Sequence, residues 1–254
     1  MITLLSPAKK LSKDCSAISS LYTIPHFLSN SLSLITQLKK MDDQELQNTM
    51  KISESLAKVN SERFASWKMP FNPKNSKEAA FFFNGDTYSG LDIQSISKND
   101  LNFLQNNIRI LSGLYGILKP LDLIMPYRLE MGTKLNVDTF KDLYQFWGNK
   151  ISKNLYTSLK SHASKTIINC ASAEYFKSVN NDHIGADIIT PVFKEYRDGK
   201  AKIISFSAKK ARGMMARFIV QNRISNPSEL KNFEVDGYKY NEDLSEPKYP
   251  LFLR

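Results

Sequence analysis

Short apolar runs alternate with longer amphipathic segments along the chain. Residues 2–6 (ITLLS), 108–111 (IRIL) and 166–172 (TIINCAS) are brief and mostly apolar, and each is followed by or ends in Pro, Gly or other small residues. Such runs are typical of buried strands. Residues 26–40 and 138–160 carry apolar side chains at helical spacing, so each range predicts an amphipathic helix. Strands interleaved with helices predict a mixed α/β fold.

Residues 41–67 keep the helical spacing. Asp42, followed by Glu45 three positions later, forms a capping-box pattern and predicts that a helix begins there. A break near residues 56–60 (LAKVN) predicts two short helices joined by a tight turn. A second capping-box pattern at residues 97–100 (SKND) predicts another helix, ending near residue 107.

Residues 78–91 begin as an apolar run and end in the turn signal Asn84-Gly85-Asp86. We therefore expect a glycine-flanked loop that presents Asp86 and Tyr88. Its glycines, Gly85 and Gly90, would let the backbone approach a ligand, or would serve a plain turn.

The C-terminal third contains the clearest hairpin signal. Residues 189–207 place two runs rich in β-branched and aromatic side chains around Asp198-Gly199, a favoured type I′ turn pair. Residues 207–223 then predict a helix capped by Ser207, with its apolar side chains on one face.

No linker, repeat or low-complexity segment divides the 254 residues. We therefore expect one compact domain over residues 1–254, with a mixed sheet flanked by helices. No run of about 18 apolar residues is present, and the N-terminus lacks a signal-peptide pattern, so we expect a cytoplasmic protein with no membrane partner. The two cysteines, Cys15 and Cys170, form no CxxC pair, and the three histidines are scattered, so we expect no metal and no cofactor.

The formal net charge is +10 and the isoelectric point is about 9.4, which favours a polyanionic partner. The range 200–228 contains seven basic residues and no acidic one. A face of one sign repels itself unless an anion binds there, and phosphate suits the guanidinium fork of Arg. The alternative is that acids from elsewhere in the fold pack onto this face.

Polar residues gather at two other places. Arg128 and Glu130, two positions apart, would share one face of a strand, as an ion pair or as an acid held beside a ligand. Open α/β sheets bind ligands where their strands end. At the end of the expected strand at 166–172, and just after it, are Asn169, Ser172, Glu174, Tyr175 and Lys177. An ordinary helix capped by Ser172 is equally compatible. No dinucleotide, P-loop or GxSxG motif is present.

Eight segments together resemble the YaaA family over essentially the whole chain. They are SPAK (6–9), GDTYSGL (85–91), RILSGLYGILKPLD (109–122), YRLEMG (127–132), LYQFWG (143–148), INCASAEYFKSV (168–179), IISFSAKKARGMMARFI (203–219) and GYKY (237–240). The resemblance implies a bacterial cytoplasmic protein of the hydrogen peroxide response. It also implies that the protein limits unincorporated iron, binds DNA, and has a helix-hairpin-helix element and a polar, positively lined cleft.

We expect the helix-hairpin-helix at about residues 43–67, with its turn at residues 57–60. Lys58 then stands where the motif usually has Gly. The DNA contacts expected from this element are Lys51, Lys58, Asn60, Arg63 and Lys68, and the partner is double-stranded or damaged DNA.

The cleft has two possible uses. As a phosphate or ligand site, it would be lined by Ser6, Lys9, Arg109, Ser112, Gly113, Arg128, Asn169, Ser172, Lys209, Lys210, Arg212 and Arg217. As the site of an enzyme acting on a nucleotide-like small molecule or a nucleic-acid base, its catalytic candidates are Asp86, Tyr88, Glu130, Glu174, Tyr175 and Lys177. The segment 109–122 would lie beside this cleft or serve only structure. Direct iron sequestration ranks last because the sequence offers no ligand spacing.

Overall fold

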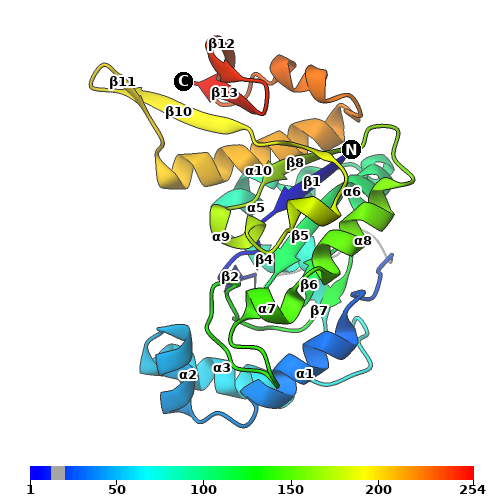
Figure 1. The fold of residues 1–254 in the computed structure, drawn as a ribbon, viewed down its shortest axis with the longest axis vertical. Coiled ribbons are helices and arrows are strands. Elements are labelled where there is room, and N and C mark those ends of the chain that lie inside the picture. Colours follow the sequence, from blue (N-terminus) through cyan, green and yellow to red (C-terminus); the bar gives the residue numbers. More distant parts are fainter. Residues whose placement is uncertain (13–20) are drawn as a thin grey trace.

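A five-stranded mixed sheet forms the centre of the fold (Figure 1). The computed structural model describes residues 1–12 and 21–254. In sheet order the strands are β6 (Gly116–Leu118), β5 (Ile108–Ser112), β1 (Ile2–Leu5), β8 (Thr166–Cys170) and β9 (Asp187–Ile189). All pairs are parallel except β5 with β6, which form a hairpin. The three apolar runs are therefore confirmed as strands, and the fold is mixed α/β as expected.

Strand β1 is central because it is apolar on both faces. Ile2, Leu4 and Leu5 are fully buried between β5 and β8. Continuous apolar strands of this kind suit a parallel sheet covered on both sides. Because β1, β5 and β8 run in the same direction, their carboxyl ends meet at one edge of the sheet, which is where such sheets bind ligands.

A second sheet has the order β11 (Lys200–Lys202), β10 (Val192–Arg197), β13 (Tyr249–Leu253) and β12 (Lys239–Glu246). The predicted hairpin is β10–β11, and its turn residues Asp198 and Gly199 have φ of 53° and 71°. These left-handed values match the type I′ turn expected there. Two short ribbons pair β2 (Lys10–Leu11) with β4 (Phe83–Asn84), and β3 (Lys77–Glu78) with β7 (Leu123–Ile124).

The two helices predicted within residues 41–67 are present, as α2 (Asp43–Met50) and α3 (Glu54–Ser66). The capping box of Asp42 and Glu45 is confirmed. The expected turn at residues 57–60 is wrong, since those residues lie inside α3. The helices separate at residues 51–53 because Lys51 adopts a left-handed conformation with φ of 53° and Ser53 caps α3.

The single helix expected over 138–160 is wrong. The segment forms α7 (Leu143–Trp147) and α8 (Lys150–Leu159), separated at Gly148. Gly148 has φ of 47° and ψ of −122°, a conformation that glycine adopts without steric cost and at which α7 ends.

The loop expected around Asp86 is also wrong, because residues Asp86–Leu91 form helix α5. This helix packs across α10 (Ser205–Gln221) at Gly90. The helix predicted to begin after Ser207 starts three residues earlier, with Ile204 at the N-cap. Ser207 is buried instead, where its hydroxyl lies 3.4 Å from Arg254 Nη2.

The remaining helices are α1 (Leu28–Leu38), α4 (Ala79–Phe82), α6 (Leu101–Asn107) and α9 (Ala173–Phe176), with short 3-10 turns at Ile93–Ser95, Lys98–Asp100, Asn181–His183 and Pro227–Asn232. One continuous apolar cluster runs from Met1 to Phe252. Within the described ranges, no helix combines the length and hydrophobicity needed to span a bilayer.

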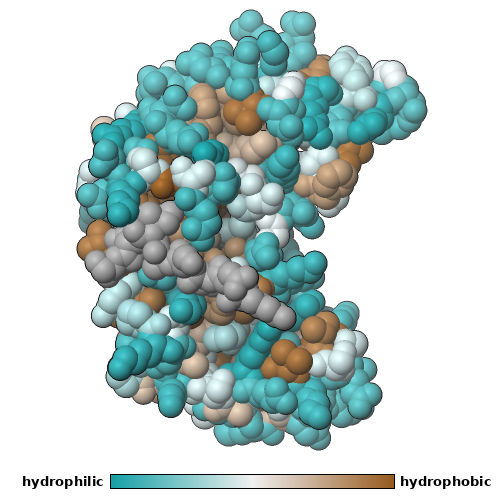
Figure 2. All heavy atoms as spheres, turned by 180° about the vertical axis from the view of Figure 1, so that it is seen from behind, coloured by the Kyte–Doolittle hydropathy of each residue, from teal (hydrophilic) through white to brown (hydrophobic). Residues whose placement is uncertain are grey.

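The two ends of the molecule project toward the same side. Helices α2 and α3 form one projection, and the hairpin β10–β11 with the start of α10 forms the other (Figure 1). The surface between them is hollowed, which gives the molecule a C-shaped profile (Figure 2). Helix α9 and ribbon strand β2 lie between the projections, at mid-height on the hollow side.

Candidate functional site

Five of the predicted site residues meet at the edge of the central sheet. Lys9, Arg128, Glu130, Glu174 and Tyr175, here called the cleft group, line a small pocket of about 60 Å³ together with Pro7, Ala8 and Leu129. Lys9 follows the end of β1, and Glu174 and Tyr175 follow the end of β8. The parallel strands therefore bring together residues that lie more than 160 positions apart in the sequence.

Glu130 joins the two cations of the cleft group. Its Oε2 lies 2.8 Å from Lys9 Nζ, and its Oε1 accepts a hydrogen bond of 3.1 Å from Arg128 Nη2. Arg128 Nε is buried and has no hydrogen-bond partner among the described residues. Arg128 therefore retains an unused donor, and Lys9, which is 61% exposed in its side chain, can change partner at little cost.

Glu174 is held by the backbone around it. Ser172 caps α9, and the Ser172 amide donates to Ser6 Oγ at 2.9 Å, which ties the ends of β8 and β1 together. Glu174 Oε1 accepts a hydrogen bond of 2.9 Å from the Gly132 amide. The prediction of a helix capped by Ser172 is confirmed, and the same cap positions an acid in the cleft.

Buried tyrosines lie beneath the cleft group. Tyr88 donates from its hydroxyl to the Ser6 carbonyl oxygen at 3.1 Å, and the hydroxyls of Tyr127 and Ser112 are 2.7 Å apart. Burial, together with neighbouring tyrosines, raises the pKa of Tyr88 and of Tyr175 well above the ordinary value. These tyrosines are neutral hydrogen-bond donors near pH 7 and are unsuited to act as bases.

Helix α3 adjoins the cleft group through Arg63. Burial lowers the pKa of the Arg63 guanidinium, and the positive charge of Arg128 lowers it further. Two guanidinium groups that repel each other in this way favour an anion placed between them. Lys51, Lys58 and Lys68 are exposed on the same helix pair. Asn60 differs from them, because it is buried and its amide donates to the Leu56 carbonyl oxygen at 2.7 Å.

Three residues predicted to line the cleft do not line its pocket. Arg109 lines a different cavity, which shares no residue with the cleft group. Ser112 is fully buried and accepts a hydrogen bond of 3.0 Å from the Tyr115 amide. Gly113 packs against backbone, since a Cβ there would lie 2.2 Å from the Leu129 carbonyl oxygen. The segment 108–118 is a hairpin, and its turn touches protein backbone.

The basic stretch at residues 200–228 is partly neutralised by acids from other segments. Four of its seven cations form ion pairs: Lys202 with Asp198, Lys210 with Asp236, Arg217 with Asp92 and Arg223 with Asp100. The Arg217 guanidinium also donates to the Asp92 carbonyl oxygen at the end of α5. The alternative in which acids pack onto this face therefore accounts for these four residues.

The other cations of the stretch, Lys200, Lys209 and Arg212, form no ion pair within the part of the chain that the structure describes. Burial raises the pKa of the Cys170 thiol to about 12, and the nearby charge of Arg212 opposes this rise. Arg212 therefore lies close to the end of β8.

The remaining candidates have peripheral or structural contacts. Asn169 is buried and accepts from the Ala171 amide at 3.1 Å. Lys177 Nζ lies 4.8 Å from the centre of the Tyr144 ring. Asp86 is exposed at the start of α5. Cys15 lies outside the described residues, and within them no three His, Cys, Asp or Glu side chains are grouped so that they could hold a metal ion.

Sequence reasoning missed the second cavity, where Arg109 lies with His26, Asp122, Asn154 and Ser158. The scattered histidines give no reason to single out His26, and Asp122 appears only as the last residue of the segment 109–122, with no role of its own. The i, i+4 spacing of Asn154 and Ser158 on an amphipathic helix is a signal for a shared polar face, but it does not say what that face meets.

Comparison with known proteins agrees with the resemblance found in the sequence. The profile of the family described as peroxide stress protein YaaA matches residues 1–244. A UPF0246 protein of Burkholderia lata is 47% identical over 256 residues, covering 100% of this chain and 98% of the relative. A UPF0246 protein of Aliivibrio fischeri is 48% identical over 254 residues, with the same coverage of both chains. The chain therefore belongs to the family of the peroxide stress protein YaaA, also called UPF0246.

Proposed function

We propose that this protein is a cytoplasmic DNA-binding protein of the hydrogen peroxide response, and that double-stranded or damaged DNA lies across the hollow between α2–α3 and β10–β11. The observation that carries the proposal is the proximity of Arg63 on α3 to Arg128 of the cleft group. It places a cation of the helix pair beside a cation of the cleft group. A phosphate backbone that crosses this surface would relieve the repulsion between the two guanidinium groups.

The helix pair supplies further cations for phosphate. Lys51, Lys58 and Lys68 are exposed, and no ion pair engages them within the described residues. Lys51 occupies the left-handed turn position between the helices, the conformation that glycine favours. We therefore propose that the hairpin of a helix-hairpin-helix element lies at residues 51–53.

The role in the peroxide response is proposed to be protection of DNA. Cys170 is buried and the pKa of its thiol is raised to about 12, so it is a poor candidate for direct reaction with peroxide. The limitation of unincorporated iron that the family resemblance implies is proposed as an indirect effect. No group of metal-binding side chains in the described ranges supports direct sequestration.

The test is binding of labelled duplex DNA, both undamaged and oxidised, across a salt series. The variant Lys51→Ala/Lys58→Ala removes two exposed cations from the helix pair. The control Lys153→Ala/Lys160→Ala makes the same charge change on α8 and at its C-cap. Both lysines are exposed and lie outside the cleft group.

We expect wild-type affinity to fall steeply with salt, and the slope of log K against log salt to decrease by about 2 in the helix-pair variant. The control variant should keep nearly the wild-type slope. Absence of binding at low salt, or an equal loss in the control, would disprove binding at this surface.

A second candidate function is an enzyme acting on a nucleotide, nucleobase or nucleic-acid base. The observation in its favour is the presence of two carboxylates, Glu130 and Glu174, among the cations of the cleft group. Phosphate binding alone has no use for acids there, whereas a positioned carboxylate can transfer protons. Screening nucleosides, nucleotides and oxidised duplex DNA for turnover tests this function. Glu174→Gln should abolish turnover while DNA affinity persists, and a variant with full turnover would exclude Glu174 as the acid or base.

A further inference from the structure

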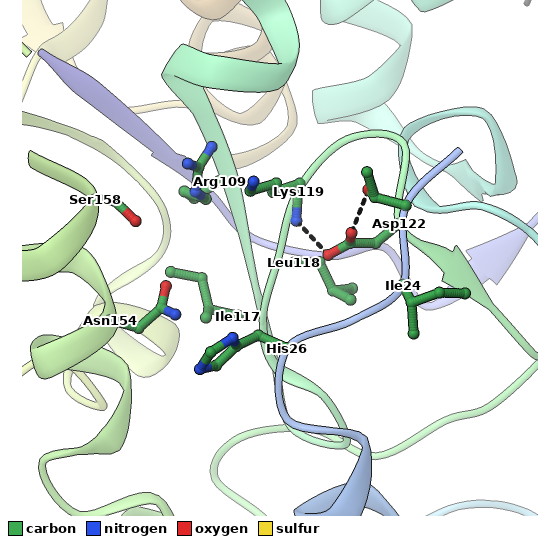
Figure 3. Close-up of a pocket in the computed structure, with 10 residues that line it drawn as sticks. Ile24, His26, Arg109, Ile117, Leu118, Lys119, Asp122, Asn154 and Ser158 are labelled. Carbon is green, nitrogen blue, oxygen red and sulfur yellow. Dashed lines mark hydrogen bonds between the residues drawn. The ribbon is translucent and has the colours of Figure 1, made fainter. Parts of the chain in front are cut away.

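A second cavity, of about 400 Å³, lies apart from the cleft group, between the hairpin β5–β6, residues 23–26 and helix α8 (Figure 3). Its volume falls within the range of small-molecule sites, which runs from roughly 300 to 1,000 Å³. Its apolar wall includes Ile24, Ile117 and Leu118. Polar side chains from three separate segments surround the open space.

Arg109 is the buried cation of this cavity, which the more exposed Lys119 also lines. Arg109 is only 5% exposed. Its Nη1 donates to three backbone carbonyl oxygens at the end of α6 and the start of β5. These belong to Gln105 (2.9 Å), Asn106 (3.2 Å) and Ile108 (2.7 Å). The structure gives Nε and Nη2 no hydrogen-bond partner among the residues it describes. One edge of the guanidinium thus anchors the side chain, while the other edge remains available as a two-pronged donor. Burial lowers the pKa of Arg109 only to about 10, so the group stays charged at neutral pH.

Asn154 and Ser158 add neutral polar groups from α8. They are four residues apart, which places them on one face of the helix, and both side chains face the open space in Figure 3. Neither side chain has a hydrogen-bond partner in the described part of the chain. His26, whose ring lies edge-on to Phe27 at 4.7 Å, completes this side of the cavity.

Asp122 lies on the opposite wall, and both of its carboxylate oxygens already accept hydrogen bonds from the protein. Its Oδ1 accepts from the Thr23 hydroxyl at 2.5 Å, and its Oδ2 accepts from the Lys119 amide at 2.7 Å. Burial raises the pKa of this carboxyl group. The acid therefore holds the turn at residues 119–122 in place, while the unused donors lie around Arg109.

We propose that this cavity binds a small organic anion, whose carboxylate or phosphate group is held by the free edge of Arg109 and by Asn154 and Ser158. The apolar wall of Ile117 and Leu118 would contact the remainder of the ligand. Carboxylate and phosphate share the planar pair of oxygens that a guanidinium edge recognises, so the geometry selects the anionic group rather than one metabolite.

The test uses three probes on the full chain: inorganic phosphate, glycerol 3-phosphate and succinate. Binding is followed by isothermal titration and by perturbation of backbone amide signals in NMR spectra. We expect saturable binding of at least one probe, with the perturbed amides in residues 23–26, 117–122 and 154–158. A preference for glycerol 3-phosphate over succinate would identify the ligand as a phosphate ester, and the reverse preference would identify a carboxylate.

Asn154→Leu and Ser158→Ala should each weaken the binding by about fivefold to tenfold, because each removes one hydrogen bond to a charged group. Thr157→Ala is the matched control on the same helix, since Thr157 is exposed and does not line the cavity. Arg109→Lys keeps the charge but loses the two-pronged edge, and it should weaken binding more than the α8 variants if the protein remains folded.

The proposal fails if no probe binds saturably up to about 10 mM. A dissociation constant of about 10 mM corresponds to a binding free energy of roughly −3 kcal/mol. It also fails if the α8 variants bind as the wild type does while Arg128→Ala abolishes binding, because the anion would then occupy the cleft.

Discussion

Gly90 on α5 and Gly213 on α10 lie where the two helices cross. A Cβ at Gly90 would lie 2.0 Å from the Lys210 carbonyl oxygen, and a Cβ at Gly213 would lie 1.8 Å from the Thr87 carbonyl oxygen. Neither obstacle is a movable side chain, so only glycine fits at both positions. The glycines near Asp86 thus have different uses, because Gly90 serves helix packing and not the approach of a ligand.

We expect Gly213→Ala to lower the free energy of unfolding by about 2–3 kcal/mol, because the added methyl group must push one helix backbone away from the other. Urea denaturation of the purified variants measures this change. Gly85→Ala is the control, since its Cβ would meet only the Ala8 Cβ at 3.3 Å, and it should cost well under about 1 kcal/mol. A Gly213→Ala protein as stable as the wild type would show that the helices can separate freely.

Glu130→Gln should strengthen DNA binding if DNA crosses the cleft group. The change releases Lys9 and Arg128 from their shared carboxylate and removes one negative charge from the surface. The slope of log K against log salt should become steeper by about 1. Glu242→Gln on β12, which is exposed, makes the same charge change away from the cleft group and should have no such effect. Weaker binding by Glu130→Gln would contradict a phosphate path at Lys9 and Arg128.

Ser112→Ala separates a structural role from a ligand-binding role for the segment 109–122. Ser112 accepts from the Tyr115 amide and bonds the Tyr127 hydroxyl, and all three groups are buried. Loss of these two hydrogen bonds should lower the free energy of unfolding by about 1–3 kcal/mol and leave DNA affinity unchanged. Ser89→Ala, on the exposed side of α5, should be nearly neutral in the same denaturation experiment. A loss of affinity with unchanged stability would restore Ser112 as a ligand contact.

Stability should fall as the pH is lowered from about 6.5 toward 4. Burial, followed by the charges of the N-terminal ammonium group, Arg109 and Lys165, lowers the pKa of His162 from 6.5 to about 4. The folded protein therefore favours neutral His162, and the unfolded chain binds more protons in this window, which favours unfolding. The effect of this one group should be about 1 kcal/mol after allowance for its partial exposure.

His162→Gln should reduce this acid sensitivity, as measured by urea unfolding at several pH values between 7.5 and 4. The N-terminal amine adds to the trend above this window, since burial and Lys165 lower its pKa from 8.0 to about 6. An identical pH profile in wild type and His162→Gln would show that His162 is not protonated differently in the two states.

Local patterns determined much of this fold. The apolar runs predicted β1, β5 and β8, the capping box predicted the start of α2, and Asp198-Gly199 predicted the turn of β10–β11. A helix capped by Ser172 was one of two alternatives for the residues after β8, and the structure contains that cap. Each of these features depends on neighbours within a few residues, so the sequence contains the whole signal.

Long-range packing decided the rest. Arg109 and Arg128 were both expected in the cleft. Arg109 lies at the start of β5, next to the end of α6, whereas the cleft group lies at the carboxyl ends of the parallel strands. Only Arg128 meets Lys9 and Glu130. The basic stretch at residues 200–228 contains no acid of its own, yet Asp92, Asp100 and Asp236 approach it through tertiary contacts. Spacing in the sequence specifies which face a side chain occupies. The element packed against that face is set by burial and charge compensation over the whole molecule, and these become visible only in the tertiary structure.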